Sequence, residues 1–439
     1  MKSPPPLLTA LILTGLAVRL VLAPYSAGSD LAQFYGFAGT MLEHGACFYS
    51  YADGIGHIGE GWPYPWPYVY GPVLAYLLAL IRRLVGGSVE AFWSDGNYYV
   101  YVDPTWALSV KLFFILADAL VALLLYRMLM SRGEKKAFFL TALYYLNPMT
   151  IYVSSIYGMF DGLALLLFLL GLYISTLKEN LSHALYGFTL AVKHTLLFPA
   201  LVSVWDALLT GRGAVKKLAL FLLGVSLPFL PLLLLCPSSL RSVPELMGGM
   251  SIGYTLPIPY SLNGVSSLAT YLHQTRGAET LALLEHWYVP AAILLSLVFV
   301  RHSFEGNLLV SSSLAYAVFV ATFWRVNPQY LAPLVAFLVL IASRGRDFPS
   351  ILALGTAIYA GFWPIMQPAS FWFHVHLKNP NWRMVHLVDS LTLRIFKDEP
   401  YVAYSLGLTV LLYLIVLTST VPHLKTLKTW LSNRLGVGA

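Results

Sequence analysis

Apolar segments that are long enough to cross a lipid bilayer recur along the whole of this 439-residue chain. A membrane-spanning helix needs about 20 mainly apolar residues. Only 11% of the residues are charged, whereas a soluble domain has about 25%. The sequence therefore predicts an all-α integral membrane protein that forms a single polytopic membrane domain over residues 1–439. Its net charge of +7 reflects topology rather than nucleic-acid binding, because basic residues gather in cytoplasmic loops.

The distribution of lysine and arginine orients the predicted segments. With Lys2 inside, the first span covers residues 7–23, and both chain termini are predicted to be cytoplasmic. Residues 24–106 then form one large external loop with two interfacial helices, 31–44 and 73–84. The second of these is apolar but too short to cross comfortably, and a crossing there would place the next basic cluster outside.

The segment that begins at Ala184 is the hardest to orient. As one span it would leave Arg212, Lys216 and Lys217 outside, so we split it at Lys193-His194 into two short helices that turn at the outer surface. About twelve transmembrane helices result. The other predicted spans cover residues 107–130, 137–153, 159–177, 218–236, 287–300, 308–323, 329–343, 350–366 and 401–420, with external segments at 237–286 and 367–400.

Charged residues inside apolar segments cost about 2.5–3.5 kcal/mol each on insertion scales, so each is a candidate functional residue. In the predicted topology they gather on the external side, apart from Asp118 and Arg19, which lie deeper in their helices. Lys111 and Asp118 share a helix face but are about 10 Å apart along the axis. We therefore expect no salt bridge between these two residues, and we expect Asp118 to hold another helix. The external candidates are Asp30, Lys111, Asp161, Lys193, His194, Arg325, Gln329 and Tyr330.

Asp30 lies seven residues after the first predicted span and directly before an amphipathic run. A carboxylate at this depth is close to the lipid headgroups, where a lipid-linked substrate presents its polar end. As a general base it would take the proton of an acceptor hydroxyl that attacks an anomeric carbon. Ser29 or Asp30 could also cap the helix 31–44, and the two roles are compatible. We predict Asp30 as the catalytic residue.

Lys193-His194 interrupts an apolar segment and has no acidic residue near it in sequence. The lysine either extends its ammonium group to the membrane surface or binds a phosphate group at headgroup depth, and we favour phosphate. Arg325 offers a second cation at the same level, close to Gln329 and Tyr330. These residues are predicted to bind substrate.

Other candidates have both a structural and a functional interpretation. Asp161 either caps the helix that it begins, which we favour, or binds substrate. Tyr70 belongs to an aromatic run at 62–72 that either stacks on sugar rings or, as we favour, forms an interfacial belt. His374, His376, His386 and Asp389 lack the spacing of a metal site. No metal ligand is predicted, and the use of a divalent metal stays open.

Cys47 and Cys236 are the two cysteines, and both fall on the outer side of the predicted topology. Disulfides persist in oxidising compartments, so a bond between these residues is compatible with that location. Separate, unpaired packing is the alternative. The sequence does not decide between the two.

Several stretches resemble the GT-C superfamily of multi-span glycosyltransferases that use polyprenyl-phosphate sugars, and most nearly the catalytic subunit of GPI mannosyltransferase I. They cover most of the chain in the expected order: Asp30 after the first span, the stretch 111–127, the stretch 146–151, the Lys193 turn, and 323–330 with its Pro-Gln-Tyr ending. The resemblance implies a GT-C-like core module at 1–236, a variable C-terminal helical module at 237–439, and a catalytic acidic residue that maps to Asp30.

Members of the mannosyltransferase I group carry two carboxylates in the first external loop, where this chain has only Ser29-Asp30. Metal use and the acceptor are therefore left open. The resemblance implies inverting transfer of a hexose, with mannose favoured, from a dolichyl- or polyprenyl-phosphate sugar to a glycolipid or glycan acceptor. The active site would lie on the extracytoplasmic or lumenal face, and the expected partners are this donor, this acceptor and the lipid bilayer.

A lipid-linked-sugar flippase or transporter is the alternative function, and a non-catalytic subunit of a glycosylation complex is another. A flippase would be expected to carry polar residues along a path through the bilayer, together with inverted repeats. The sequence instead gathers its polar residues on one side and shows no such symmetry. We therefore favour a membrane glycosyltransferase with Asp30 as general base.

Overall fold

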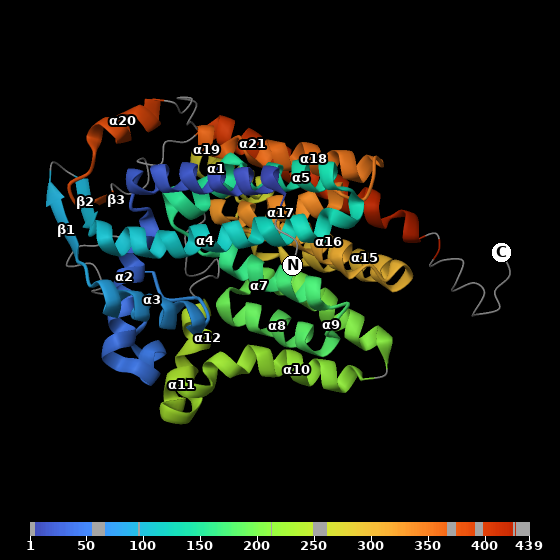
Figure 1. Ribbon diagram of the computed structural model, residues 1–439, viewed down its shortest axis with the longest axis horizontal. Helices are drawn as coiled ribbons and strands as arrows, with labels where there is room; N and C mark the ends of the chain where they lie inside the picture. Colours follow the sequence, from blue (N-terminus) through green and yellow to red (C-terminus); the bar gives the residue numbers. More distant parts are fainter. Residues whose placement is uncertain are drawn as a thin grey trace.

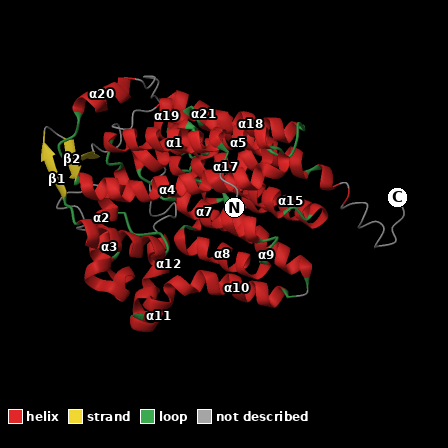
Figure 2. Cartoon of the chain, viewed as in Figure 1, coloured by secondary structure: helices red, strands yellow, loops and turns green. Residues whose placement is uncertain are grey.

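The computed structural model describes residues 5–54, 66–94, 97–211, 213–248, 261–366, 375–390, 398–424 and 426. Helices make up most of the molecule, and a small sheet lies with α2, α3 and α20 at one end of the helical bundle (Figure 1, Figure 2). Several features considered above lie outside the described residues, namely Lys2, 62–65 of the aromatic run, Arg212 and His374.

The helices are α1 Pro6–Leu22, α2 Ser29–His44, α3 Pro72–Val85, α4 Pro104–Leu129, α5 Glu134–Tyr145, α6 Pro148–Ile151, α7 Asp161–Ile174, α8 Glu179–Val192, α9 Leu197–Thr210, α10 Ala214–Ser226, α11 Leu230–Leu235, α12 Ser242–Gly248, α13 Gly264–Arg276, α14 Ala282–Glu285, α15 Tyr288–Glu305, α16 Leu308–Thr322, α17 Leu331–Ala342, α18 Phe348–Ala360, α19 Trp363–Met366, α20 Trp382–Ser390 and α21 Asp398–Thr420. The strands are β1 Val89–Ser94, β2 Asn97–Val102 and β3 Val375–Leu377.

Within the described residues, 6 helical segments are long and apolar enough to cross a membrane by length and composition. All six coincide with predicted spans, and shorter apolar helices occur at α7, α9, α16 and α17. The structure thus confirms a helical protein with several candidate membrane spans. The six segments are Pro6–Tyr25, Pro104–Arg132, Ala214–Leu235, Ala282–Glu305, Phe348–Met366 and Asp398–Leu424.

The predicted break at Lys193 is confirmed. α8 ends just before Lys193, whose backbone is extended (φ −151°, ψ 123°), and a 3₁₀ turn leads into α9. The Lys217 ammonium contacts both the Glu179 carboxylate at the start of α8 and the Thr210 hydroxyl at the end of α9. A single ammonium can reach both only if the two helices run antiparallel. α8 and α9 therefore form a hairpin with Lys193 at its tip.

The span predicted at 137–153 is not one helix. α5 ends before Asn147, and Pro148 opens the short helix α6, because proline lacks an N–H and is favoured in a first helical turn. The Asn147 side chain caps α6 by accepting from the Met149 N–H at 2.9 Å. The chain then continues through a π-helical turn, Tyr152–Tyr157. This departure from a straight helix brings Tyr157 to the end of the bundle that holds α2.

The segment 24–106, predicted as the first external loop, contains helices at both positions where interfacial helices were predicted, α2 and α3, and also two strands that were not predicted. β1 and β2 pair antiparallel, and β3 pairs with β2 in parallel, in the order β1-β2-β3. Val100 lies opposite Val375, and Val102 lies opposite Leu377. The sheet therefore joins the first external loop to the segment that follows α19. The expected external segment 237–286 also contains helices, α12, α13 and α14.

α16 and α17 occupy the centre of the bundle. Every residue of α17 is buried, and so is every residue of α16 from Val310 to Thr322. α17 contacts α5, α7, α16 and α18. A helix that is buried on all sides needs no polar face, which explains the uniformly apolar sequence of α17.

Arg19 and Asp118, the two deep charged residues, form a buried ion pair with 3.5 Å between Nη2 and Oδ2. Arg19 also donates to the Tyr145 carbonyl at 2.8 Å and to the Thr150 hydroxyl at 3.1 Å, and the Tyr144 hydroxyl donates to Asp118 at 3.3 Å. Asp118 thus holds α1 against α4, as expected. The prediction that Asp118 is not paired with Lys111 is also confirmed.

Lys111 has a structural role at the other end of α4. Its buried ammonium donates to the backbone carbonyls of Ala23 and Ile156, each at 2.9 Å, and to that of Ser26. These carbonyls come from the end of α1 and from the π turn. Lys111 therefore joins the two segments between which Asp30 is placed.

Cys47 and Cys236 form a disulfide, with 5.3 Å between their Cα atoms. Cys47 lies in the turn Gly45–Tyr51 after α2, and Cys236 follows the last residue of α11. The structure thus decides between the two alternatives for the cysteines. The bond fixes the first external loop to the end of the α10–α11 segment.

Candidate active site

Asp30 lies in the first turn of α2, and the residue that caps this helix is Gly28. Gly28 has a left-handed backbone (φ +71°), and a Cβ added there would lie 1.9 Å from the Tyr157 carbonyl oxygen. Only glycine combines this backbone with so close an approach. The interpretation of Asp30 as an N-cap is therefore wrong. Gly28 instead sets Asp30 beside the π turn.

The Asp30 side chain is half-buried and faces charges from two distant parts of the chain. Burial raises its pKa above the ordinary 3.8, while the charge of Lys193, a hydrogen bond from the Tyr157 hydroxyl and the charge of Arg325 act in the opposite direction. A raised pKa makes the carboxylate a stronger proton acceptor than an exposed aspartate. Asp30 therefore has the properties of a general base.

Lys193 and Asp161 form a buried ion pair, with 2.7 Å between Nζ and Oδ2. Both side chains are almost fully buried, at 1% and 0% exposure. Phe160, rather than Asp161, is the N-cap of α7, so the favoured capping interpretation of Asp161 is wrong. The alternative in which Lys193 reaches the membrane surface is also wrong. The sequence predicted separate roles for Asp161 and Lys193 and no ion pair between them.

Aromatic rings surround the Lys193 ammonium. Its Nζ lies 4.3 Å from the ring centre of Phe160 and 5.5 Å from those of Tyr70 and Tyr330. The Tyr70 ring in turn packs edge-on against Phe160, with 4.9 Å between ring centres. A desolvated cation is stabilised by the faces of such rings. Tyr70 is thus part of the candidate site, on the side of the ion pair.

Arg325 is a cation of the site that makes no ion pair with a described residue. It is half-buried in the loop between α16 and α17, and its guanidinium lies 5.0 Å from the ring centre of Trp66. Its buried Nε has no hydrogen-bond partner, and the guanidinium makes no ion pair with any described residue. A planar guanidinium with free N–H groups is suited to bidentate binding of a phosphate or carboxylate.

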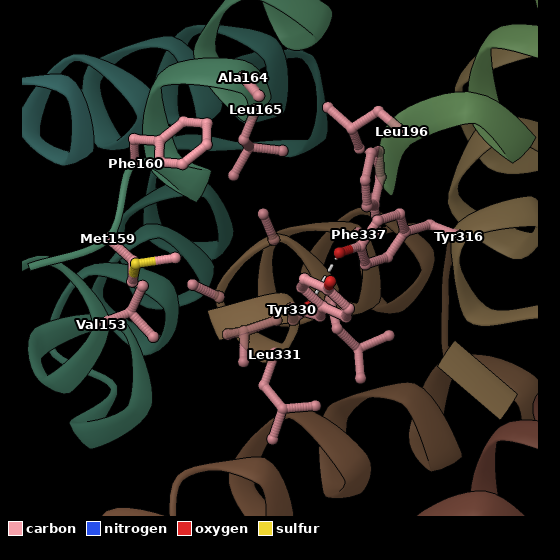
Figure 3. Packing of buried hydrophobic residues seen from close by; sticks show 14 of the residues in the cluster. Val153, Met159, Phe160, Ala164, Leu165, Leu196, Tyr316, Tyr330, Leu331 and Phe337 are labelled. Atoms are coloured by element: carbon pink, nitrogen blue, oxygen red, sulfur yellow. Dashed lines mark hydrogen bonds between the residues drawn. The ribbon is translucent and has the colours of Figure 1, made fainter. Parts of the chain in front are cut away.

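Gln329 and Tyr330 follow Arg325 in a 3₁₀ turn that leads into α17. Gln329 is 3% exposed, and its Oε1 has no hydrogen-bond partner among the described residues. The Tyr316 hydroxyl donates to the Tyr330 carbonyl at 3.0 Å, within the apolar packing that holds this turn (Figure 3). The same packing includes Phe160 and Leu196, which flank Asp161 and the hairpin tip (Figure 3). Apolar packing thus holds the segments that carry the charged groups against one another.

His194 lies next to Lys193 at the hairpin tip. Its side chain is half-buried, and the buried Nδ1 has no hydrogen-bond partner among the described residues. Among the described residues, neither the His194 nor the Gln329 side chain makes a hydrogen bond or ion pair with another predicted site residue. The position of His194 still places an imidazole beside the ion pair.

The structure brings together most of the predicted site. The charge of Asp30 acts on Lys193, Arg325, Tyr70 and Tyr330, and also on Asp161. Sequence reasoning missed Tyr157 and the part that Trp66 plays beside Arg325. A signal for Tyr157 was present, because the glycine that follows it permits the tight turn. This glycine is Gly158, and a Cβ added there would lie 2.9 Å from the Leu31 side chain.

No group of three or more His, Cys, Asp and Glu side chains that could hold a metal ion occurs among the described residues. His376 is instead packed between aromatic rings, with 5.0 Å from its ring centre to that of Trp382. In comparisons with known proteins, no family model and no curated protein matches this chain. The interpretation of the site therefore depends on its own geometry.

Proposed function

We propose that the protein is a membrane glycosyltransferase of GT-C type. It transfers a hexose, with mannose favoured, from a polyprenyl- or dolichyl-phosphate sugar to a glycolipid or glycan acceptor. The observation that carries this proposal is the half-buried Asp30 carboxylate, which lies within the electrostatic influence of Arg325, a guanidinium that makes no ion pair with a described residue. A base beside an anion-binding group is the pair that displacement of a phosphate by a hydroxyl requires.

In the proposed reaction, Asp30 accepts the proton of the acceptor hydroxyl as its oxygen forms a bond to the anomeric carbon. The bond from that carbon to the phosphate oxygen breaks, and its electron pair leaves with the polyprenyl phosphate. Attack opposite the leaving group inverts the configuration at this carbon. Arg325 stabilises the departing phosphate, while Lys193, already paired with Asp161, acts through its charge.

The proposed topology has about twelve spans, formed by the six long segments, α5 with α6, α7, the two helices of the α8–α9 hairpin, α16 and α17. The site would face the extracytoplasmic or lumenal side, with both termini cytoplasmic. The Cys47–Cys236 disulfide supports this orientation, because disulfides persist in oxidising compartments. It lies in the same external loop as Asp30.

The test is the variant Asp30→Asn, assayed in detergent with a radiolabelled prenyl-phosphate hexose. Loss of general-base catalysis should lower transfer about 10²- to 10⁴-fold, while binding of the donor persists. Glu43→Gln is the matched control, because it removes an exposed carboxylate from the same helix and should leave transfer unchanged. Near-normal turnover by Asp30→Asn would defeat the assignment. Donor binding without any transfer by the native protein would favour the flippase or the non-catalytic subunit.

A further inference from the structure

A small cavity lies at the opposite end of α4 from the candidate active site. α4 begins beside α2, where the Trp106 indole donates to the Leu31 carbonyl at 3.3 Å. It then runs for 26 residues, which is about 39 Å of helix. The cavity has a volume of about 130 Å³ and is lined by residues that follow or end α4, α15 and α17. It is therefore separate from the proposed reaction site.

Two arginines, Arg132 and Arg344, line this cavity together with Ser131, Ser343 and Asn307. The lining contains no carboxylate. Arg132 is exposed, and its guanidinium makes no hydrogen bond or ion pair with any described residue. The Asn307 side-chain oxygen already accepts from the Val310 N–H at 3.1 Å, which leaves its amide N–H groups as donors. The cavity thus presents an excess of donors and of positive charge.

The acid that pairs with Arg344, Glu305, does not neutralise this charge. Glu305 Oε2 lies 3.9 Å from Arg344 Nη2, but the same carboxylate also pairs with Arg301 and, at 2.9 Å, with His423. One negative charge is therefore shared among three basic groups. Lys136, which donates to the Ser343 carbonyl at 2.9 Å, adds a further cation beside the cavity.

We propose that this cavity binds the phosphate group of an anionic ligand. Two arginines can bind a phosphate through paired N–H···O bonds, and the volume has room for several water molecules and so for one phosphate group. Apolar residues such as Leu309 and Leu340 form the rest of the wall. At the end of a candidate span, the phosphate could come from an anionic lipid headgroup or from free phosphate, and the chemistry of recognition is the same.

The test is native mass spectrometry of the detergent-solubilised protein with phosphatidylglycerol, phosphatidylcholine or inorganic phosphate added separately. The native chain should retain one phosphatidylglycerol or one phosphate in preference to phosphatidylcholine. The variant Arg132→Gln/Arg344→Gln should weaken this binding about tenfold or more. Lys135→Gln, which removes an exposed charge near the cavity but not from its lining, should bind as the native protein does.

The arms of the experiment distinguish the source of the phosphate. Retention of phosphatidylglycerol alone identifies a lipid headgroup site, and retention of inorganic phosphate identifies a site for the free anion. The variant Arg132→Lys/Arg344→Lys keeps the positive charge but loses the planar guanidinium groups. It should bind the phosphate ligand more weakly than the native protein and more tightly than the double glutamine variant. Equal retention of the ligand by the native protein and the double glutamine variant would overturn the proposal, provided that thermal unfolding curves show both proteins to be folded. Equal retention of phosphatidylcholine and phosphatidylglycerol with no phosphate binding would overturn it as well.

Discussion

At the scale of single residues, the site combines charged side chains that have an ion-pair partner with charged side chains that have none among the described residues. Lys193 and Asp161 neutralise each other inside a ring of aromatic side chains. Asp30 and Arg325 are half-buried, neither makes an ion pair with a described residue, and the buried Arg325 Nε has no hydrogen-bond partner among these residues. Removing an ion from water is costly unless a partner replaces the water, so natural proteins rarely leave such groups unpaired without a function. The unpaired members are the ones expected to meet substrate.

The raised pKa of Asp30 predicts a pH dependence of transfer. The reaction needs the ionised carboxylate, so activity should fall as the pH decreases through the raised pKa, above the ordinary 3.8. Arg325 lowers this pKa through its charge. In Arg325→Gln the acid limb of the kcat profile at saturating donor should therefore move to higher pH. Arg83→Gln, an exposed change in α3, is the control. An acid limb that is the same in all three proteins would contradict the role of Asp30.

At the scale of elements, the site depends on close contacts between segments that are far apart in sequence. The α8–α9 hairpin brings its tip to the start of α7, and the loop before α3 packs on the end of α8. A Cβ at Gly71 would lie 1.8 Å from the Ala191 carbonyl oxygen, so this approach requires glycine. The Asp161–Lys193 pair is the polar contact that joins α7 to the hairpin.

Breaking this pair should destabilise the protein. Asp161→Asn leaves the Lys193 ammonium buried without a carboxylate and should lower the free energy of unfolding by about 3–5 kcal/mol. The double variant Asp161→Leu/Lys193→Met replaces both ions with apolar side chains and should recover most of that loss. Unfolding in detergent measures both effects. If Asp161→Asn were as stable as the native protein, the pair would not be what holds α7 to the hairpin.

The sequence was sufficient to predict the long helices, the helical structure of α2 and α3 and the break at Lys193, because each follows from local hydrophobicity and from the placement of basic residues. It was not sufficient for contacts across the chain. The partner of Lys193 lies 32 residues earlier, so no local pattern reveals it. The strands were not predicted although β2 reads Asn-Tyr-Tyr-Val-Tyr-Val, a composition typical of strands, because hydropathy marks apolar spans and not short strands between them. The span at 137–153 failed for a local reason, since Pro148 was overlooked as a helix breaker.

At the scale of the whole molecule, two long-range connections fix the end that carries the site. The sheet ties the first external loop to the segment after α19, and the disulfide ties it to α11, 189 residues away in sequence. Near Cys47, Tyr49 donates to the Tyr70 carbonyl at 2.8 Å. The disulfide is thus linked, through one tyrosine, to a ring that faces Lys193.

The disulfide should contribute to stability. Loss of a native disulfide typically costs about 2–5 kcal/mol, and the long intervening chain places this bond at the upper part of that range in the chain-entropy model. We therefore expect a reductant to lower the Tm of the native protein in detergent. Cys47→Ser/Cys236→Ser should unfold at that lower temperature whether or not the reductant is present. Equal Tm values for native and reduced protein would show that the bond adds nothing.

The same bond closes a covalent ring of polypeptide that runs from Cys47 through α3 to α11 and back. A protease that cuts once anywhere inside this ring cannot release a fragment. The nicked chain keeps its full mass on a non-reducing gel and separates into two bands only after reduction. A cut before residue 47 or after residue 236 releases its fragment under either condition, so a pair of gels is enough to assign a cleavage site to the inside or the outside of this ring.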